Sequence, residues 1–367
     1  MDLSKLYQTQ ISFTEWLQRM NHKDAEAHRK EDNEKRERLA VLNDVFGLPF
    51  DRPTQFPATE VSERSERFVK FLDEHGDELC AFRMMPFDHA LPKLRTRGAS
   101  VRDTLVWFEE QKIDPTQYKV DVVPHTDAQV WVTIFVVNEK GAFGQIAHGR
   151  HSQLTQGFYE NDNVPMTFVY DFSQWQIVPE VEGARQHLEI LMNHLRVSDP
   201  AAREVLQCDL GATFAGEHLC GYFETTTSDE FGVWFVDYNR ILGASYSGTS
   251  VILSDNEGSS AGILRGQIGS KGKATGRARV IRVADLAGAD IEEGDIIVTD
   301  MTTPDFLPMM QKSGGVVTAW GGILSHAAIV CRELGKPCLT NAKGVLDSIQ
   351  DGSIIEVDAE KGAINLL

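Results

Sequence analysis

Near its C-terminus the chain reads Gly321-Gly322-Ile323-Leu324-Ser325-His326-Ala327-Ala328-Ile329-Val330-Cys331-Arg332-Glu333-Leu334-Gly335-Lys336-Pro337, and this stretch decides the fold of the last part of the protein. The apolar run 316–320 before it predicts a buried strand, and the two glycines predict a tight turn. Residues 327–334 predict a helix, which Gly335 and Pro337 end. His326 therefore lies where a turn leads from a strand into a helix N-terminus.

The position of His326 suits a nucleophile that accepts and passes on phosphate. Unpaired backbone N–H groups and the positive end of the helix dipole gather at a helix N-terminus, where they favour a phosphoryl group on an imidazole nitrogen. A neutral imidazole is also nucleophilic near pH 7. We therefore predict His326 as the catalytic residue, with Gly321, Gly322, Ser325 and Arg332 as supporting residues of its domain. The more common role of a lone histidine at such a position is a cap or a buried, hydrogen-bonded side chain.

The region 266–367 resembles the phosphohistidine domain of the phosphoenolpyruvate-utilising enzymes, which include pyruvate phosphate dikinase, phosphoenolpyruvate synthase and rifampicin phosphotransferase. The motifs that carry the resemblance are the segments 276–280, 303–305, 321–337 and 352–367. The resemblance implies a swivelling β/β/α domain in which His326 is phosphorylated transiently. The chain departs from the pattern at Leu324, where the dikinases usually carry threonine, so one hydroxyl that could hold the phosphate is missing.

Composition sets wide bounds on the rest of the protein. The 367 residues suffice for about two or three domains, and 42% of them are hydrophobic. A formal net charge of -18 argues against general binding to nucleic acid or to an anionic membrane. We find no apolar stretch of membrane-spanning length and no signal sequence, and the five cysteines lack metal-type spacing, so we expect a soluble cytoplasmic protein with free thiols.

The organisation along the chain predicts an α+β or α/β multidomain fold. We divide it into a charged helical N-terminal segment (1–59), an ATP-grasp-like nucleotide-binding domain (60–244), a serine- and glycine-rich linker (245–264) and the phosphohistidine domain (265–367). The mixed-charge run 23–38 predicts an exposed, solvated helix. Apolar patterns beyond it predict strands and helices in alternation. The expected strands are 79–84, 118–123, 130–137, 166–170, 218–225 and 232–237, and the expected helices are 61–75, 101–111, 180–196 and 199–206.

A second group of polar residues precedes the linker. Asp237 and Asn239 are two residues apart on one predicted strand and so share a face, and Glu224 lies on the strand before the turn 228–230. Oxygen-bearing side chains of this kind predict a magnesium site that holds nucleotide phosphates, although a polar strand end beside a turn is the more common explanation. The group resembles the closing hairpin of ATP-grasp domains, in which acidic and amide residues followed by an arginine bind magnesium and ATP. That resemblance assigns Arg240 to the nucleotide.

Upstream segments supply the remaining nucleotide contacts in this prediction. Arg83 ends a strand that is similar to the one supplying a phosphate-binding arginine in the dikinases. Lys93 and Arg95 belong to a basic segment, 91–101, which we expect to be a loop closing over the triphosphate. A solvated basic loop is an equally good explanation. Asp127 follows a predicted hinge strand and is assigned to the ribose.

Together the two parts predict a phosphotransferase of the dikinase type. ATP, bound with Mg2+ near the residues above, phosphorylates His326, and the histidine domain then swings on the linker to an acceptor. No acceptor domain is evident, so either a partner subunit holds the acceptor or a small acceptor binds in a cleft between residues 1–59 and the nucleotide domain. We favour the partner subunit. Two alternatives remain open: a non-catalytic phosphocarrier or regulatory subunit, and an ATP-grasp ligase that keeps the histidine domain as a relic.

Overall fold

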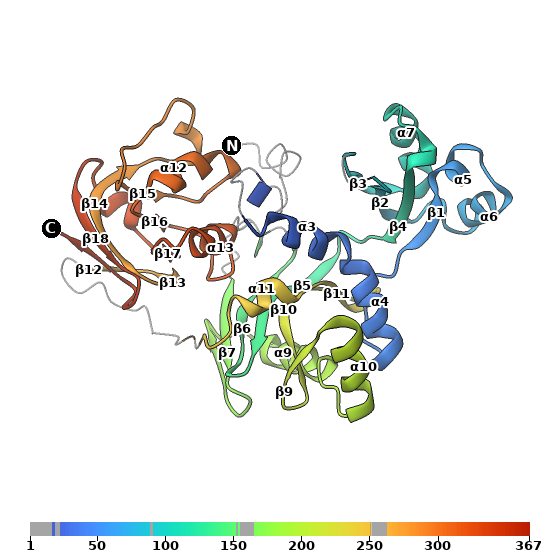
Figure 1. The fold of residues 1–367 in the computed structure, drawn as a ribbon, viewed down its shortest axis with the longest axis horizontal. Helices are drawn as coiled ribbons and strands as arrows, with labels where there is room; N and C mark the ends of the chain where they lie inside the picture. Colours follow the sequence, from blue (N-terminus) through green and yellow to red (C-terminus); the bar gives the residue numbers. More distant parts are fainter. Residues whose placement is uncertain are drawn as a thin grey trace.

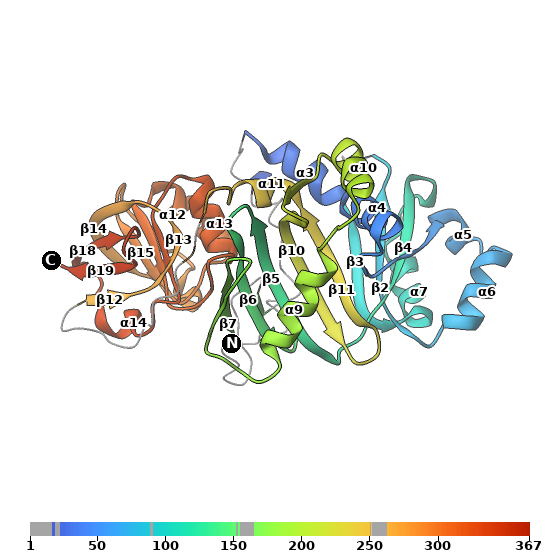
Figure 2. The same cartoon turned by 90° about the horizontal axis from the view of Figure 1, so that it is seen from below.

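The computed structural model describes residues 17–18, 23–88, 91–151, 153–154, 165–249, 251 and 263–367. The described residues form three β-sheets, each built from one consecutive part of the chain and each covered by helices (Figure 1). The three sheets lie in a row, with the second sheet between the other two (Figure 2). This mixed arrangement confirms the predicted α+β and α/β multidomain class. Most of the predicted linker, from residue 252 to 262, lies outside the described residues.

The first sheet is antiparallel, with the strand order β1-β4-β2-β3. Its strands are β1 (Thr54–Pro57), β2 (Leu79–Pro86), β3 (Leu94–Ser100) and β4 (Tyr118–Pro124). The helices α5 (Ala58–Ser62), α6 (Glu66–His75) and α7 (Val101–Glu110) and the 3-10 turn η1 (Pro115–Gln117) complete this part. Phe56, Phe68, Phe82 and Val120 form its core. Because side chains alternate along a strand, Arg83 lies on the face of β2 opposite to Phe82.

The basic segment 91–101 is not the loop that we predicted. Residues Leu94–Ser100 form β3, which pairs along its length with β2. Ser100 then begins α7, because its side chain accepts a hydrogen bond from the backbone N–H of Asp103 at 3.1 Å. The pattern of cations hid the strand, since an edge strand with one polar face carries little apolar signal.

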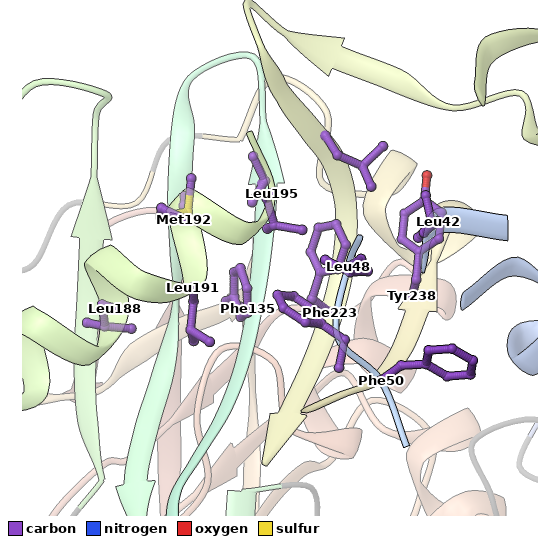
Figure 3. Packing of buried hydrophobic residues seen from close by; sticks show 14 of the residues in the cluster. Leu42, Leu48, Phe50, Phe135, Leu188, Leu191, Met192, Leu195, Phe223 and Tyr238 are labelled. Carbon is purple, nitrogen blue, oxygen red and sulfur yellow. The ribbon is translucent and has the colours of Figure 1, made fainter. Parts of the chain in front are cut away.

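The second sheet is also antiparallel, with the order β11-β10-β5-β6-β7-β8, and β9 pairs with one end of β10. Its strands are β5 (Gln129–Asn138), β6 (Gly141–His148), β7 (Met166–Tyr170), β8 (Trp175–Val178), β9 (Thr213–Ala215), β10 (His218–Ser228) and β11 (Gly232–Asn239). The helices α3 (Ala25–Asn33), α4 (Lys35–Phe46), α9 (Ala184–His194), α10 (Pro200–Leu210) and α11 (Arg240–Ala244) surround it. Figure 3 shows Leu188, Leu191 and Met192 of α9 beside Phe135 and Phe223 of the sheet.

The mixed-charge run 23–38 is not a solvated helix as we predicted. It forms α3 and the first turn of α4, and four of its polar side chains are buried: His28, Glu31, Arg36 and Arg38. Burial is tolerated because the charges are paired inside the protein, with Glu31 3.4 Å from Arg38 and Arg36 bonded to Asp51. The segment 23–38 therefore forms part of the two helices, α3 and α4, that surround the second sheet.

The third sheet is mixed, with the order β12-β19-β18-β14-β15-β16-β17-β13 and a parallel centre from β14 to β17. Its strands are β12 (Ile263–Arg265), β13 (Gln267–Ser270), β14 (Lys273–Val280), β15 (Ile296–Thr299), β16 (Gly315–Thr318), β17 (Cys338–Thr340), β18 (Ile354–Asp358) and β19 (Ala363–Leu366). The helices are α12 (Leu307–Lys312), α13 (His326–Glu333) and α14 (Val345–Ser348), with the 3-10 turns η2 (Val283–Asp285) and η3 (Pro304–Phe306). Apolar clusters cover both faces of the parallel strands. In the part of the chain that the structure describes, no helix is long and apolar enough to cross a membrane.

Candidate phosphotransfer site

His326 is the first residue of α13, directly after the turn that follows β16. Ser325 begins the helix, because its hydroxyl accepts a hydrogen bond from the backbone N–H of Ala328 at 3.5 Å. Gly321 has a φ of +98°, a conformation that residues with a Cβ rarely adopt. Burial lowers the pKa of His326, so its imidazole is neutral at pH 7 and has a nitrogen lone pair available. The turn and the cap together place this neutral imidazole at the helix N-terminus.

The loop that carries His326 packs against the second sheet. Ile323, Leu324 and Ile329 are buried in one apolar cluster with side chains of that sheet and of the segment after it. The cluster's other buried members are Val132, Ile134, Val136, Phe143, Ala147, Leu154, Tyr222, Leu242 and Tyr246. A Cβ on Gly322 would lie 1.7 Å from Oε1 of Gln145, a buried residue of β6, so the backbone of the turn lies directly on the sheet. Figure 2 shows α13 at the β6 side of this sheet.

Polar contacts tie α13 to the segment just after α11. The guanidinium of Arg332 lies over the ring of Tyr246, 3.8 Å from its centroid, and donates to the carbonyl of Gly269 at 2.9 Å. The Tyr246 hydroxyl donates to the carbonyl of Ile323 at 3.4 Å. Arg332 therefore acts between the histidine domain and the second sheet, at the helix end away from His326.

Glu224 lies close enough to His326 for its charge to act on the imidazole. The Glu224 carboxylate opposes the effect of burial on the pKa of His326. It also accepts a hydrogen bond from the Tyr222 hydroxyl at 2.7 Å and lies 3.2 Å from Nε2 of His151. Burial alone would raise the pKa of Glu224, but His151 and other partners lower it to about 2. Glu224 is therefore ionised at pH 7 beside the candidate nucleophile.

Asp237 stands directly opposite Glu224 in the pairing of β10 with β11. Burial, with the nearby Glu224 charge, raises the pKa of Asp237 to about 6 despite Lys35, whose Nζ lies 3.5 Å away. Lys35 also lies 3.1 Å from Asp32 of α3. The Oδ1 atom of Asp237 is buried without a hydrogen-bond partner among the described residues. An ionised carboxylate next to a buried oxygen without a partner fits a cation that prefers oxygen ligands, such as Mg2+.

The first sheet presents a row of charged residues toward this pair of carboxylates. Arg83 stands between Asp121 on β4 and Arg95 on β3 in the strand register. Burial lowers the pKa of Arg83, and the charges of Asp121, Asp32 and Asp237 oppose that effect. Lys93 lies 3.2 Å from Asp32 and so joins the same network. The cations of the first sheet and the carboxylates of the second sheet therefore interact electrostatically.

The remaining predicted residues have other neighbours in the structure. The side chain of Asn239 caps α11, because its Oδ1 accepts from the backbone N–H of Leu242 at 2.9 Å. The guanidinium of Arg240 is bound to the buried Glu31 at 2.5 Å, so its charge is already balanced. Asp127 lies on the strand connection, 63% exposed and 3.4 Å from His125. The structure thus brings Arg83, Lys93, Glu224, Asp237 and His326 into one region. Arg240 is held by an ion pair with α3.

Four residues of this region were not predicted from the sequence as site residues: Asp32, Lys35, Asp121 and His151. Asp32 and Lys35 lie in the charge run that looked solvated, and Asp121 lies inside an apolar strand. The strand offered one usable signal, since a lone carboxylate in the run 118–124 is unusual for a buried strand. Among the described residues, no three His, Cys, Asp or Glu side chains come together as a metal-holding group. Glu224 and Asp237, which stand opposite each other, could hold a magnesium ion here.

Comparison with known proteins supports the resemblance that the sequence analysis found for the C-terminal part of the chain. Residues 291–362 match the family model described as "PEP-utilising enzyme, mobile domain". The chain is 43% identical over 102 residues to a probable phosphoenolpyruvate synthase of Archaeoglobus fulgidus, a match that covers 28% of this chain and 13% of that protein. It is 41% identical over 106 residues to a rifampicin phosphotransferase of Streptomyces sviceus, covering 29% of this chain and 12% of that one. Residues 291–362, which form much of the third sheet and its helices, are therefore similar to the mobile domain of the PEP-utilising enzymes.

The relatives are much longer than the matched region, since the chain covers about an eighth of their length. Among solved structures, N5-carboxyaminoimidazole synthase from Aspergillus clavatus is 8% identical, with a TM-score of 0.31 and coverage of 56% of this chain and 43% of that one. A similarity at that level defines no fold. The predicted ATP-grasp-like region 60–244 consists of two α+β lobes, each with an antiparallel sheet, and its assignment to nucleotide binding stays a prediction.

Proposed function

We propose that this protein is a phosphotransferase that transfers a phosphoryl group from ATP to His326 and then to an acceptor. The observation that carries the proposal is the packing of the His326 loop against the sheet that bears Glu224 and Asp237, where the charge of Glu224 acts on the imidazole. A nucleophile, two carboxylates for a metal and cations for phosphate are the parts that phosphoryl transfer needs. The match of residues 291–362 to the mobile domain supports the same reaction.

In this reaction a nitrogen of His326 attacks a phosphorus atom of ATP, the N–P bond forms, and the P–O bond to the rest of the nucleotide breaks. The lowered pKa of His326 keeps the lone pair free at pH 7. Arg83, with Lys93 and Arg95, would balance the phosphate charge. Glu224 and Asp237 would hold Mg2+, which shields the transferring group from their own negative charge. The group that leaves depends on which phosphorus atom is attacked, and ATP labelled separately at the β and γ positions identifies that atom.

The acceptor and its location form the second half of the proposal. We propose that a partner subunit holds the acceptor and that the histidine domain moves to it. The linker 245–264 would allow that movement. All five cysteines are free thiols, which supports a cytoplasmic location as part of the same proposal.

Nucleotide binding is tested by thermal unfolding with and without Mg2+-ATP. A ligand at 100 times its Kd stabilises the folded state by about 2.7 kcal/mol, which is readily measured as a shift in Tm. We expect the shift for the wild type and a much smaller one for Asp237→Asn and Arg83→Gln. Asp77→Asn serves as a matched control for charge, since the side chain of Asp77 is 95% exposed and outside the predicted site. If ATP and Mg2+ leave the wild-type Tm unchanged, the protein is a phosphocarrier charged by another subunit.

The ligase alternative makes a different prediction. A ligase would release phosphate from ATP in the presence of its carboxylate and amine substrates without using His326. Its activity would therefore survive His326→Ala. The burial of the histidine loop against the carboxylate-bearing sheet favours phosphotransfer over this alternative, because a relic domain needs no such contact.

A further inference from the structure

The surface that joins the histidine domain to the second sheet is apolar at the turn just before His326. Leu324 is 2% exposed and Ile323 is 4% exposed, although both lie in a turn, where polar residues are usual. Their neighbours are Val132, Ile134 and Phe143 on one face of β5 and β6. This face is opposite to the one that packs against α9, so the sheet has two buried faces.

The contact has a defined shape as well as an apolar character. Gly322 lies on Gln145, where a Cβ would overlap the side-chain amide. Tyr246 closes one side, with its hydroxyl on the Ile323 carbonyl and its ring under Arg332. On the other side of the turn, Gln267 of β13 donates to the Thr167 hydroxyl of β7 at 3.0 Å. The loop is therefore held from several directions, and His326 follows Leu324 by two residues.

We infer that Ile323 and Leu324 are positioning residues that dock the histidine loop on the second sheet, so that His326 receives the phosphoryl group in this docked arrangement. The inference rests on the proposed function and adds the residues that control the encounter. Docking buries two branched aliphatic side chains that would otherwise face water. It places the imidazole where the charge of Glu224 acts on it. Release of the loop exposes the same side chains, so their size and polarity set the balance between the docked and the free domain.

The docked arrangement also predicts how His326 reacts with small donors. Phosphoramidate can phosphorylate histidine directly: the N–P bond to the imidazole forms, the P–N bond of phosphoramidate breaks, and ammonia leaves. In the docked arrangement the ionised Glu224, whose charge acts on the imidazole, repels this anion. We expect slow labelling by phosphoramidate in the wild type and fast labelling whenever the loop is free. Labelling by ATP is instead expected to be fast when the loop is docked and slow when the loop is free.

The test compares the two donors on the full chain and on docking variants. Leu324→Asn replaces the isobutyl group by a polar amide of similar length without adding the hydroxyl that the related enzymes carry at this position, and Ile323→Asn/Leu324→Asn weakens the contact further. We expect phosphoramidate labelling of His326 to rise about tenfold in Leu324→Asn. ATP labelling is expected to fall about tenfold or more in the double variant. Leu324→Met, which keeps volume and apolar character, should restore both rates to near the wild type.

A matched control separates docking from loss of folding. Leu339 is a buried leucine of β17 in the same domain, packed in a cluster that contains no described residue of α13. Leu339→Asn should lower the Tm without changing the ratio of the two labelling rates. If Leu324→Asn leaves both rates unchanged, or if Leu339→Asn changes their ratio equally, the docking role is refuted. If phosphoramidate labelling responds as expected while ATP labels no form of the protein, docking stands and the proposed function fails.

Discussion

His187 offers a quantitative test of the core that supports the site. It lies on α9, is 5% exposed, and its ring stacks near Trp131 with centroids 5.8 Å apart. Its Nε2 atom has no hydrogen-bond partner among the described residues. Burial, and secondarily the charge of His194, lowers the pKa of His187 to about 4, from 6.5 for an unperturbed histidine. Protonation of His187 should therefore destabilise this core.

The sign and size follow from proton linkage. Below pH 6.5 the unfolded chain binds a proton at His187 that the folded chain still excludes, so stability falls as the pH falls from 6.5 toward 4. One unit of pKa difference corresponds to about 1.4 kcal/mol, so the full loss is about 3 kcal/mol. At pH 5 about 2 kcal/mol of it should already be lost.

The assay is urea unfolding of the wild type and of His187→Leu between pH 7.5 and pH 4.5. Titrating groups other than the coupled His194 act equally in both proteins, so the difference between their unfolding free energies reports His187 together with its interaction with His194. We expect the variant to gain about 2 kcal/mol relative to the wild type between pH 7.5 and pH 5. A difference that stays constant over this range would show that His187 is not buried as a neutral side chain, and would refute the reasoning.

Two further predictions concern the charges and the turn. Glu31→Gln leaves the partly buried Arg240 without its counter-charge and should lower the unfolding free energy by about 3 kcal/mol. Glu26→Gln, on the exposed side of the same helix, should lower it by less than about 1 kcal/mol. Denaturant unfolding measures both variants, and equal effects would contradict the buried pair. Gly322→Ala should slow ATP labelling of His326, because its Cβ would overlap Gln145, and Gln145→Ala in the same chain should restore the rate; a failure of this rescue would show that the clash is elsewhere.

Much of the fold was readable from local patterns in the sequence. The strand 166–170 was predicted with its observed bounds, and the strands 118–123 and 130–137 were predicted to within one residue at each end. The helix after His326 differs from its prediction by one residue, because Ser325 is a strong cap and Gly335 a strong stop. The strand β6, Gly141–His148, was missed because its glycines and lack of alternation resemble a loop. Gly144 is required there, since a Cβ would lie 2.2 Å from the carbonyl of Ile134.

The site was predicted only in part, for a physical reason. Glu224 and Asp237 could be paired from their positions on two strands of a hairpin. The charged helices could not be placed, because a charge run has the same local pattern whether water or buried partners balance it. Lys35 reaches Asp237 across a sequence separation that no local rule covers. The docking of Leu324 on the second sheet could not be predicted from the sequence either, because a turn residue belongs to no periodic apolar pattern.

The central claim is that His326 carries the phosphoryl group, and its most direct test is the mass of the intact protein after incubation with Mg2+ and ATP labelled separately at the β and γ positions. We predict one acid-labile, base-stable phosphoryl group on the wild type, mapped to His326, and none on His326→Ala. The labelled position identifies the phosphate that moves. A wild-type protein without label, or a label that persists in His326→Ala, would contradict the account.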